Sequence, residues 1–305
     1  MKRKYKLTEE TINVNGITLY RIEALKDFGD VKEGDKGGFI ESEENLSHDG
    51  NCWVYGIAKV FENANVFGNA KVYGDAKVCG AAEVYGEAWV YGDAKIFDNA
   101  KVYGAAEVFD NAKVHTNAEV FGKANVFGDA EVFGHAKVYV NAWVYGNAKV
   151  CGNANVFSYA KVFGYANVYG YANVYGDANI FGNAKVCGNA KVFDYAKVCV
   201  DAEVYGNSMV FGYAKVYGDA NVFGYAEVCG DALIKDMSDY IVFKNWWSSG
   251  RYFTWTRSND MWKVGCFYGT GKELVEKAYK DSELSGREYK RVVDYVESVL
   301  KEIKS

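Results

Sequence analysis

The sequence lacks several residues and patterns, and each absence argues against a class of protein or site. No run of the 305 residues approaches the roughly 18 to 20 apolar residues that a membrane span needs, so we expect no membrane association. Seven cysteines, an odd number, include no C-x-x-C pair, which argues against a zinc site and a secreted disulfide framework. The net charge of −5 is small and indicates neither a large basic surface nor an acidic mimic of nucleic acid. Proline is absent while glycine numbers 33, and so skewed a composition calls for a search for repeats.

The amino-terminal stretch, MKRKYKLTEETINVNG, is charged and holds no apolar core of signal-peptide length. We therefore expect a cytoplasmic protein. The five cysteines at positions 79, 151, 187, 199 and 229 all occupy a repeat position that is otherwise aromatic. They are expected to replace Phe or Tyr, and neither a metal nor a cofactor is predicted.

The centre of the chain repeats every six residues. From Val54 to Ile234 each sixth position is Val or Ile, which makes 31 hexads without an insertion or deletion. The position two residues before is Ala, except at Cys52 and Ser208, and the position two residues after is Gly in most hexads, usually followed by Asn or Asp. A period of six gives an α-helix no fixed face, but it fits a short strand followed by a turn.

Strand alternation assigns the two faces of each hexad. In the hexad 70–75 (AKVYGD), Ala and Val lie on one side and Lys and Tyr on the other, and Gly-Asx supplies a corner because both residues tolerate positive φ. Each hexad would then form one flat side of a coil and contribute one methyl and one branched side chain to the inside. These make a core only where identical coils stack, with their strands ~4.8 Å apart. Ala and Val are therefore predicted to fill a narrow interior.

These hexads resemble the hexapeptide-repeat family, whose pattern combines an aliphatic residue, variable positions and a small residue. The resemblance spans Cys52 to about Ile234 and implies an all-β solenoid, a left-handed, three-sided parallel β-helix of about ten 18-residue coils. A right-handed three-sided solenoid, as in polymerising bactofilins, is the main alternative. The aromatic residue after the aliphatic departs from the family pattern. The chain also resembles uncharacterised bacteriophage and prophage proteins of this type, and a phage-encoded protein would act in the host cytoplasm.

Both ends of the chain differ from the repeat, as protection of a solenoid's open strand edges requires. Residues 1–50 contain TINVNGITLYRI, which predicts a capping β-hairpin around Asn15-Gly16. Ile40 and Leu46 fall on the alanine register, so the first coil is expected to begin before Val54. After the solenoid at 51–237, residues 238–305 are predicted to form a small α+β domain. It has three strands, in DYIVFKNWW, RYFTWTR and MWKVGCFYG, and two helices separated near Ser285-Gly286.

Steps of 18 residues place Trp53, Trp89 and Trp143 on one flat, beside a column of tyrosines. One hypothesis is a docking surface for a partner protein, a second copy of the chain or the terminal domains. The other is that aromatic ladders merely stabilise neighbouring coils, at ~0.2 to 1 kcal/mol per pair. Tyrosine also replaces Asn or Asp at six corners of the second half, for which the sequence suggests no role: Tyr159, Tyr165, Tyr171, Tyr195, Tyr213 and Tyr225.

The next flat carries Lys59, Lys77, Lys95 and Lys113 in four successive coils. Like charges at one-coil spacing repel, so a bound anion such as a nucleotide or nucleic acid would be favoured there. The alternative is a row of solvated lysines, because Lys is the commonest residue at this repeat position.

The carboxyl-terminal region concentrates residue types that dominate binding hot spots. They are Trp246, Trp247, Trp255, Trp262, Arg251 and Arg257. The alternative is a small core built on tryptophan, which we expect for at least two of the four. Strand alternation would point Trp246 and Trp247 to opposite faces and expose one of them.

Enzymes of the hexapeptide family are mostly acyltransferases with a catalytic histidine, but this chain has three histidines, His48, His115 and His135. None is predicted to face a carboxylate placed to orient it as a general base, and no loop interrupts the hexads. We therefore expect a non-catalytic β-solenoid that binds a macromolecular partner, a second copy included. The alternatives are a protein that sequesters a small molecule or nucleotide to block a host defence, and, third, an acyltransferase.

Overall fold

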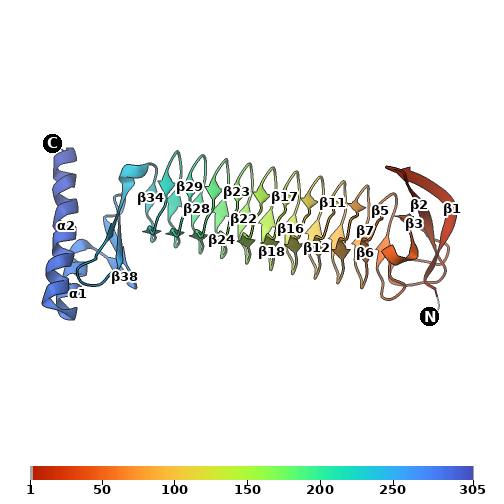
Figure 1. Ribbon diagram of the computed structural model, residues 1–305, viewed down its shortest axis with the longest axis horizontal. Helices are drawn as coiled ribbons and strands as arrows, with labels where there is room; N and C mark the ends of the chain where they lie inside the picture. Colours follow the sequence, from red (N-terminus) through yellow and green to blue (C-terminus); the bar gives the residue numbers. More distant parts are fainter. Residues whose placement is uncertain (1–2, 305) are drawn as a thin grey trace.

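The structure is a computed structural model that describes residues 3–304, with side chains up to Glu302. It is a long rod with a group of amino-terminal strands at one end and a helix-bearing domain at the other (Figure 1). Within the rod each hexad contributes one two-residue strand. The strands begin with β4 (Trp53–Val54), β5 (Lys59–Val60) and β6 (Asn65–Val66) and recur every six residues to β34 (Leu233–Ile234).

The strands form the three flats of a parallel solenoid. Every third strand belongs to the same sheet, so that Val54 pairs with Val72 and Val90 with Val108, each 18 residues further along the chain. We call the sheet that runs from β4 to β34 the tryptophan flat, the one that continues from β5 to β32 the lysine flat, and the one from β6 to β33 the third flat. The predicted three-sided parallel solenoid is confirmed, and its coils number about eleven once the amino-terminal turn is included. Its left-handed winding stays a prediction.

The interior is as narrow as the repeat predicted. The alanines and the Val or Ile residues of the hexads are at most 1% exposed. Ser208, which stands at an alanine position, is also buried, and its hydroxyl donates to the carbonyl oxygen of Tyr205 at 2.8 Å. A buried polar group is tolerated here because it is hydrogen-bonded.

The corners use a left-handed backbone conformation throughout. The residue two places after the aliphatic has a φ of +71° at Gly74, and the non-glycine residues at this position keep the same conformation, with φ of 66° at both Val140 and Val200. A Cβ built on Gly74 would lie 2.9 Å from the carbonyl oxygen of Gly92 in the next coil. Glycine is therefore favoured both by the backbone angle and by the close approach of the coils.

The aromatic residues after the aliphatics stack in ladders along the rod. Neighbours such as Tyr85 and Tyr103 have ring centroids 4.8 Å apart and an interplanar angle of 1°, and Phe109 and Phe127 are stacked equally well. These rings are half-buried. The aromatic ladders are thus present, and they account for the aromatic residue that departs from the usual family pattern. That they stabilise neighbouring coils stays a prediction.

The amino-terminal cap extends the lysine flat. Strands β1 (Tyr5–Val14) and β2 (Ile17–Ala24) form the predicted hairpin around Asn15-Gly16, and β3 (Lys36–Ile40) joins β2 to β5. A short 3-10 helix, η1 (Glu43–Asn45), follows β3. The first coil does begin before Val54, but the predicted register is wrong.

Ile40 pairs with Val60 and Leu46 with Val66, so both occupy the aliphatic position instead of the alanine position. Each pair is 20 residues apart, whereas Val54 pairs with Val72, 18 residues further along, in the ordinary register. Two additional residues in the corner between Leu46 and Gly50 account for the difference.

The carboxyl-terminal unit is an antiparallel sheet packed on two helices. After η2 (Met237–Asp239) come β35 (Tyr240–Lys244), β36 (Tyr252–Thr256), β37 (Met261–Val264) and β38 (Phe267–Gly269), then α1 (Gly271–Asp281) and α2 (Glu283–Lys304). The third predicted strand is thus two strands that turn at Gly265. The helices separate at Ser282, not near Ser285-Gly286, because the Ser282 hydroxyl accepts a hydrogen bond from the Ser285 N–H and caps α2. Gly286 instead permits close packing, since a Cβ there would lie 2.2 Å from the Tyr279 ring.

Candidate functional site

The tryptophan flat holds all three solenoid tryptophans, as predicted, but they do not form one surface. Trp53 is 1% exposed, because Tyr5 and Phe28 of the cap pack edge-on against its ring at centroid distances of 6.0 and 5.3 Å. It is therefore not available to an external partner. Trp89 and Trp143 are 41% and 42% exposed and lie three coils apart.

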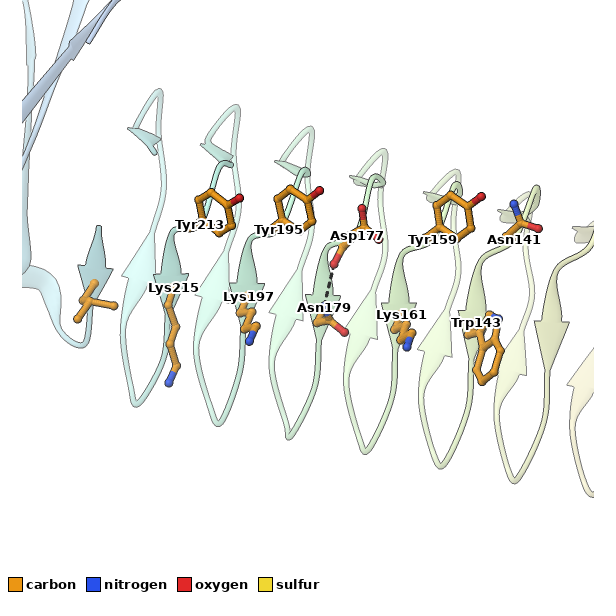
Figure 2. Close-up of a pocket in the computed structure, with 11 residues that line it drawn as sticks. Asn141, Trp143, Tyr159, Lys161, Asp177, Asn179, Tyr195, Lys197, Tyr213 and Lys215 are labelled. Carbon is orange, nitrogen blue, oxygen red and sulfur yellow. Dashed lines mark hydrogen bonds between the residues drawn. The ribbon is translucent and has the colours of Figure 1, made fainter. Parts of the chain in front are cut away.

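A groove of about 660 Å³ runs along the second half of this flat. Figure 2 shows two parallel rows of side chains in it, with Tyr159, Tyr195 and Tyr213 at the corners and Trp143 and lysines on the strands. The lysines are Lys161, Lys197 and Lys215. The sequence marked the corner tyrosines without a role and missed these lysines; sorting both columns by 18-residue steps would have brought them together.

The tyrosines of this groove are well exposed. Tyr159, Tyr195 and Tyr213 expose 60%, 52% and 70% of their surface, and the rings of Tyr195 and Tyr213 are stacked at 5.0 Å. Lys161 lies over the Trp143 ring, with its Nζ 5.3 Å from the centroid. Large aromatic surfaces that remain open to solvent are typical of contact sites.

The lysine flat places Lys59, Lys77, Lys95 and Lys113 in successive paired strands, as predicted. These lysines line a groove of their own. A column of acidic corner residues lines it as well: Asp75, Asp93 and Asp129. The Lys59 ammonium lies 3.9 Å from the Asp75 carboxylate. Three carboxylates beside four ammonium groups offset most of the positive charge, so this flat is a weaker anion site than the lysine column alone indicated.

The carboxyl-terminal tryptophans divide into two pairs. Trp255 and Trp262 face each other as a cross-strand pair, are each 2% exposed, and belong to the core of the domain, so they are not partner-contacting residues. Trp246 and Trp247 are 72% and 77% exposed. They lie in the turn after β35, outside the strand, and the predicted alternation that would bury one of them is wrong.

Charged groups surround the exposed pair. The Lys244 ammonium lies 4.3 Å from the Trp246 ring centroid and 4.7 Å from that of Tyr252. Arg251 is exposed in the same loop. Arg257 is half-buried and donates to the Ser238 hydroxyl at 3.3 Å, which holds it at the junction with the solenoid. Trp246, Trp247 and Arg251 therefore form one exposed loop, which we call the tryptophan loop.

Two histidines face carboxylates, contrary to expectation, and His115 is the one that lies in the solenoid. His115 is stacked between Phe97 and Phe133, and its Nε2 lies 3.2 Å from a Glu131 carboxylate oxygen. Burial of Glu131 raises its pKa, but hydrogen bonds from His115 and Lys149 lower it by more, so the pKa lies below the ordinary value. The sequence prediction failed because the two residues occupy different positions of the repeat. His115 is at the aromatic position, and Glu131 comes two residues before the aromatic position of the next coil, so they are 16 residues apart and not 18.

Of the other two histidines, His48 lies in the cap with its Nε2 3.6 Å from the Glu43 carboxylate. His48 accepts a hydrogen bond from the Lys4 N–H at 3.2 Å and stacks on Tyr5, within the cap. His135 is an exposed corner residue.

The five cysteines at the ladder position are buried or half-buried there, as predicted. Cys52 is buried at an alanine position, Cys266 is exposed in the carboxyl-terminal domain, and all seven are free. Burial raises the pKa of the Cys79 thiol to about 11 and that of Cys229 to about 12, which disfavours the reactive thiolate. Among residues 3–304 no group of three or more His, Cys, Asp or Glu side chains is placed to hold a metal ion. No helix in this part of the chain is both long and apolar enough to cross a membrane.

Comparison with known proteins gives a partial relationship. No protein-family model matches the chain. The chain is 41% identical over 61 residues to a curated protein of Escherichia coli (strain K12) described as "Uncharacterized acetyltransferase YdcK". The match covers 17% of this chain and 19% of the relative, so the two are alike over about a fifth of the relative's length.

This match and the solenoid together fit a hexapeptide-repeat β-helix. The match also contradicts the expectation that the chain is not an enzyme, because the relative is described as an acetyltransferase. The contradiction is weak, since the similarity extends over little more than three coils' length of chain. The resemblance to phage proteins stays a prediction.

Proposed function

We propose that the protein is a β-solenoid scaffold that binds a macromolecular partner through the groove of the tryptophan flat and the tryptophan loop. The observation that carries this proposal is the exposure of the adjacent Trp246 and Trp247, at 72% and 77%. Full burial of a large apolar side chain stabilises a protein by roughly 1.5 to 3 kcal/mol. Two neighbouring indoles left in solvent are therefore best explained by a partner that covers them.

The test is affinity capture from a host lysate by the full chain. We expect a partner that binds the wild-type protein and is lost from the W246S/W247S variant. The matched control replaces Leu284 and Tyr295, exposed side chains on α2 of the same domain, by Ser. Equal capture by wild type and W246S/W247S would contradict a role for the loop, and loss in the control as well would indicate nonspecific adhesion to apolar surface.

A second candidate function, acyl transfer, is favoured by the match to the described acetyltransferase and by the His115–Glu131 contact of 3.2 Å. With Nε2 bonded to the carboxylate, the other imidazole nitrogen, Nδ1, lies 3.2 Å from the Thr116 hydroxyl and would have to leave this contact to deprotonate an amine or hydroxyl substrate. The assay is release of CoA thiol from acetyl-CoA in the presence of a panel of amines and sugars.

The informative variant is His115→Phe, because Phe is the commonest neighbour in this ladder and preserves the stacking. Turnover by the wild type that His115→Phe abolishes would support acyl transfer. Turnover that survives in His115→Phe, or no turnover with any acceptor, would contradict acyl transfer by this residue.

A further inference from the structure

The groove of the tryptophan flat differs from the rest of the rod in its charge. Several strand lysines on the other two flats are paired with a Glu one coil away, as in Lys101 with Glu83 at 2.9 Å and Lys137 with Glu119 at 3.0 Å. Lys161, Lys197 and Lys215 have no carboxylate within 4.0 Å among the described residues. Asp177 is the one acidic residue that lines the groove, so three ammonium groups face a single carboxylate.

The same groove carries the exposed aromatic rings. The tyrosines at 159, 195 and 213 form a row parallel to the lysines (Figure 2). By contrast, the groove of the lysine flat has three aspartates and no exposed ring among its lining residues. Among the grooves described above, only that of the tryptophan flat therefore combines an excess of positive charge with a line of exposed rings. The stacked Tyr195 and Tyr213 leave only their outer faces for a base.

The length of the groove matches a polymer. It extends over five coils, from Asn141 to Leu233, which is about 24 Å at ~4.8 Å per coil. Single-stranded nucleic acid is recognised by basic grooves that follow the phosphates and by aromatic side chains on which unpaired bases stack, with the shortest sites about 4 nucleotides long. A duplex would hide its base faces and leave the tyrosines without a role.

We propose that this groove binds single-stranded nucleic acid. The lysines at 161, 197 and 215 contact phosphates, and the rings of Tyr159, Tyr195 and Tyr213 stack on bases. This inference rests on the proposed function and names the partner for one of its two surfaces. An acidic polysaccharide is negatively charged like nucleic acid but has no bases. Loss of the tyrosines should therefore weaken the binding of nucleic acid and not that of the polysaccharide.

The experiment is fluorescence anisotropy of the full chain with dye-labelled dT12. In K161E/K197E/K215E we expect affinity to fall at least about tenfold. The matched control, K77E/K95E/K113E, makes the same change of charge at the same repeat position on the lysine flat and should bind within about twofold of wild type. Three phosphate contacts also predict a slope of log affinity against log salt of about −2.

The tyrosines supply the second arm. Y195S/Y213S should weaken dT12 binding by at least about tenfold, since the loss of even one stacked base costs ~1 to 3 kcal/mol. The control is Y165S/Y171S, which removes exposed tyrosines from corners of the other flats. The inference would be overturned if the protein did not bind dT12, or if both lysine variants lost affinity equally. It would also be overturned if heparin and dT12 bound alike and the tyrosine variant bound both as wild type does.

These outcomes are separate from those of the proposed function. A protein partner captured through the tryptophan loop, without binding of dT12, would leave the scaffold proposal standing and refute nucleic-acid binding. Loss of both would refute both.

Discussion

At the residue scale, the corners of the solenoid impose one backbone conformation on whatever side chain occupies them. Glycine adopts it without cost, Asp occupies it at three corners, and Glu, Thr and Ser occupy it at one corner each. Val140 and Val200 are the extreme cases, since each combines a β-branched side chain with a φ of 66°. Both are also more than 40% exposed, so their side chains gain little from burial.

We therefore predict that V140G and V200G each stabilise the protein, by about 1 kcal/mol, because the left-handed region costs a non-glycine residue ~1 to 2 kcal/mol. The measurement is the thermal or urea midpoint of each variant. The control is Val138→Gly, which removes a fully buried side chain from the adjacent aliphatic position and should destabilise. A lowered midpoint in V140G and V200G would show that the conformation at these corners differs from that described.

Residue patterns were also the most predictable level of this protein. The use of Ala and of Val or Ile at the inward positions follows from the space in a narrow shaft, and Cys52 and Ser208 are the two exceptions in the hexads. The burial of Trp53 was not predictable, because it depends on Phe28 and Tyr5, which are distant in sequence and follow no period. His115 and Glu131 are likewise brought together only by the stacking of coils.

At the element scale, the direction of the hydrogen bonds explains both ends of the rod. Each coil donates its N–H groups to the carbonyls of the following coil, as Lys59 does to Ala76. The first coil therefore has carbonyls without donors and the last coil has N–H groups without acceptors. The cap supplies donors: the Lys4 ammonium bonds the Cys52 carbonyl at 2.9 Å, and the Tyr5 hydroxyl bonds that of Leu46 at 2.7 Å.

The carboxyl-terminal domain supplies the acceptors. The Thr254 hydroxyl accepts from the Glu227 N–H at 2.9 Å and the Ser258 hydroxyl from the Leu233 N–H at 2.7 Å. Composition alone indicated that the ends protect the strand edges, but not which side chains do so, because Thr254 and Ser258 belong to no repeat. The sequence also did not predict that Trp246 and Trp247 leave β35. They lie in a loop, where the alternation of side chains along a strand does not apply.

We predict that Thr254→Val lowers stability by about 1 to 3 kcal/mol, because it leaves the Glu227 N–H without an acceptor while nearly preserving shape. Thr254→Ser retains the hydroxyl and should lose less. Hydrogen exchange should place the change in the last coil, with middle coils unaffected, since solenoid repeats interact mainly with their neighbours. A larger loss in Ser, which lacks the methyl group, than in Val, which lacks the hydroxyl, would argue that packing of the methyl group, and not the hydrogen bond, joins the domain to the rod.

At the scale of the whole molecule, the rod holds its columns in register along its length, and both proposed surfaces depend on that register. Residues 18 apart are neighbours on one flat, which is what assembles the lysines and tyrosines of the groove. A change in the period would scatter them over three faces.

The most direct test of the account is therefore a distance between nitroxide labels at positions 95 and 185. Both are exposed lysines of the lysine flat, in β11 (Lys95–Ile96) and β26 (Lys185–Val186), five coils apart. The labels can be attached through p-acetylphenylalanine, which leaves the native cysteines in place. Pulsed electron paramagnetic resonance should give a mean distance of about 24 Å, at ~4.8 Å per coil. A mean above about 34 Å, equivalent to two further coils, would contradict the 18-residue coil and the surfaces built on it.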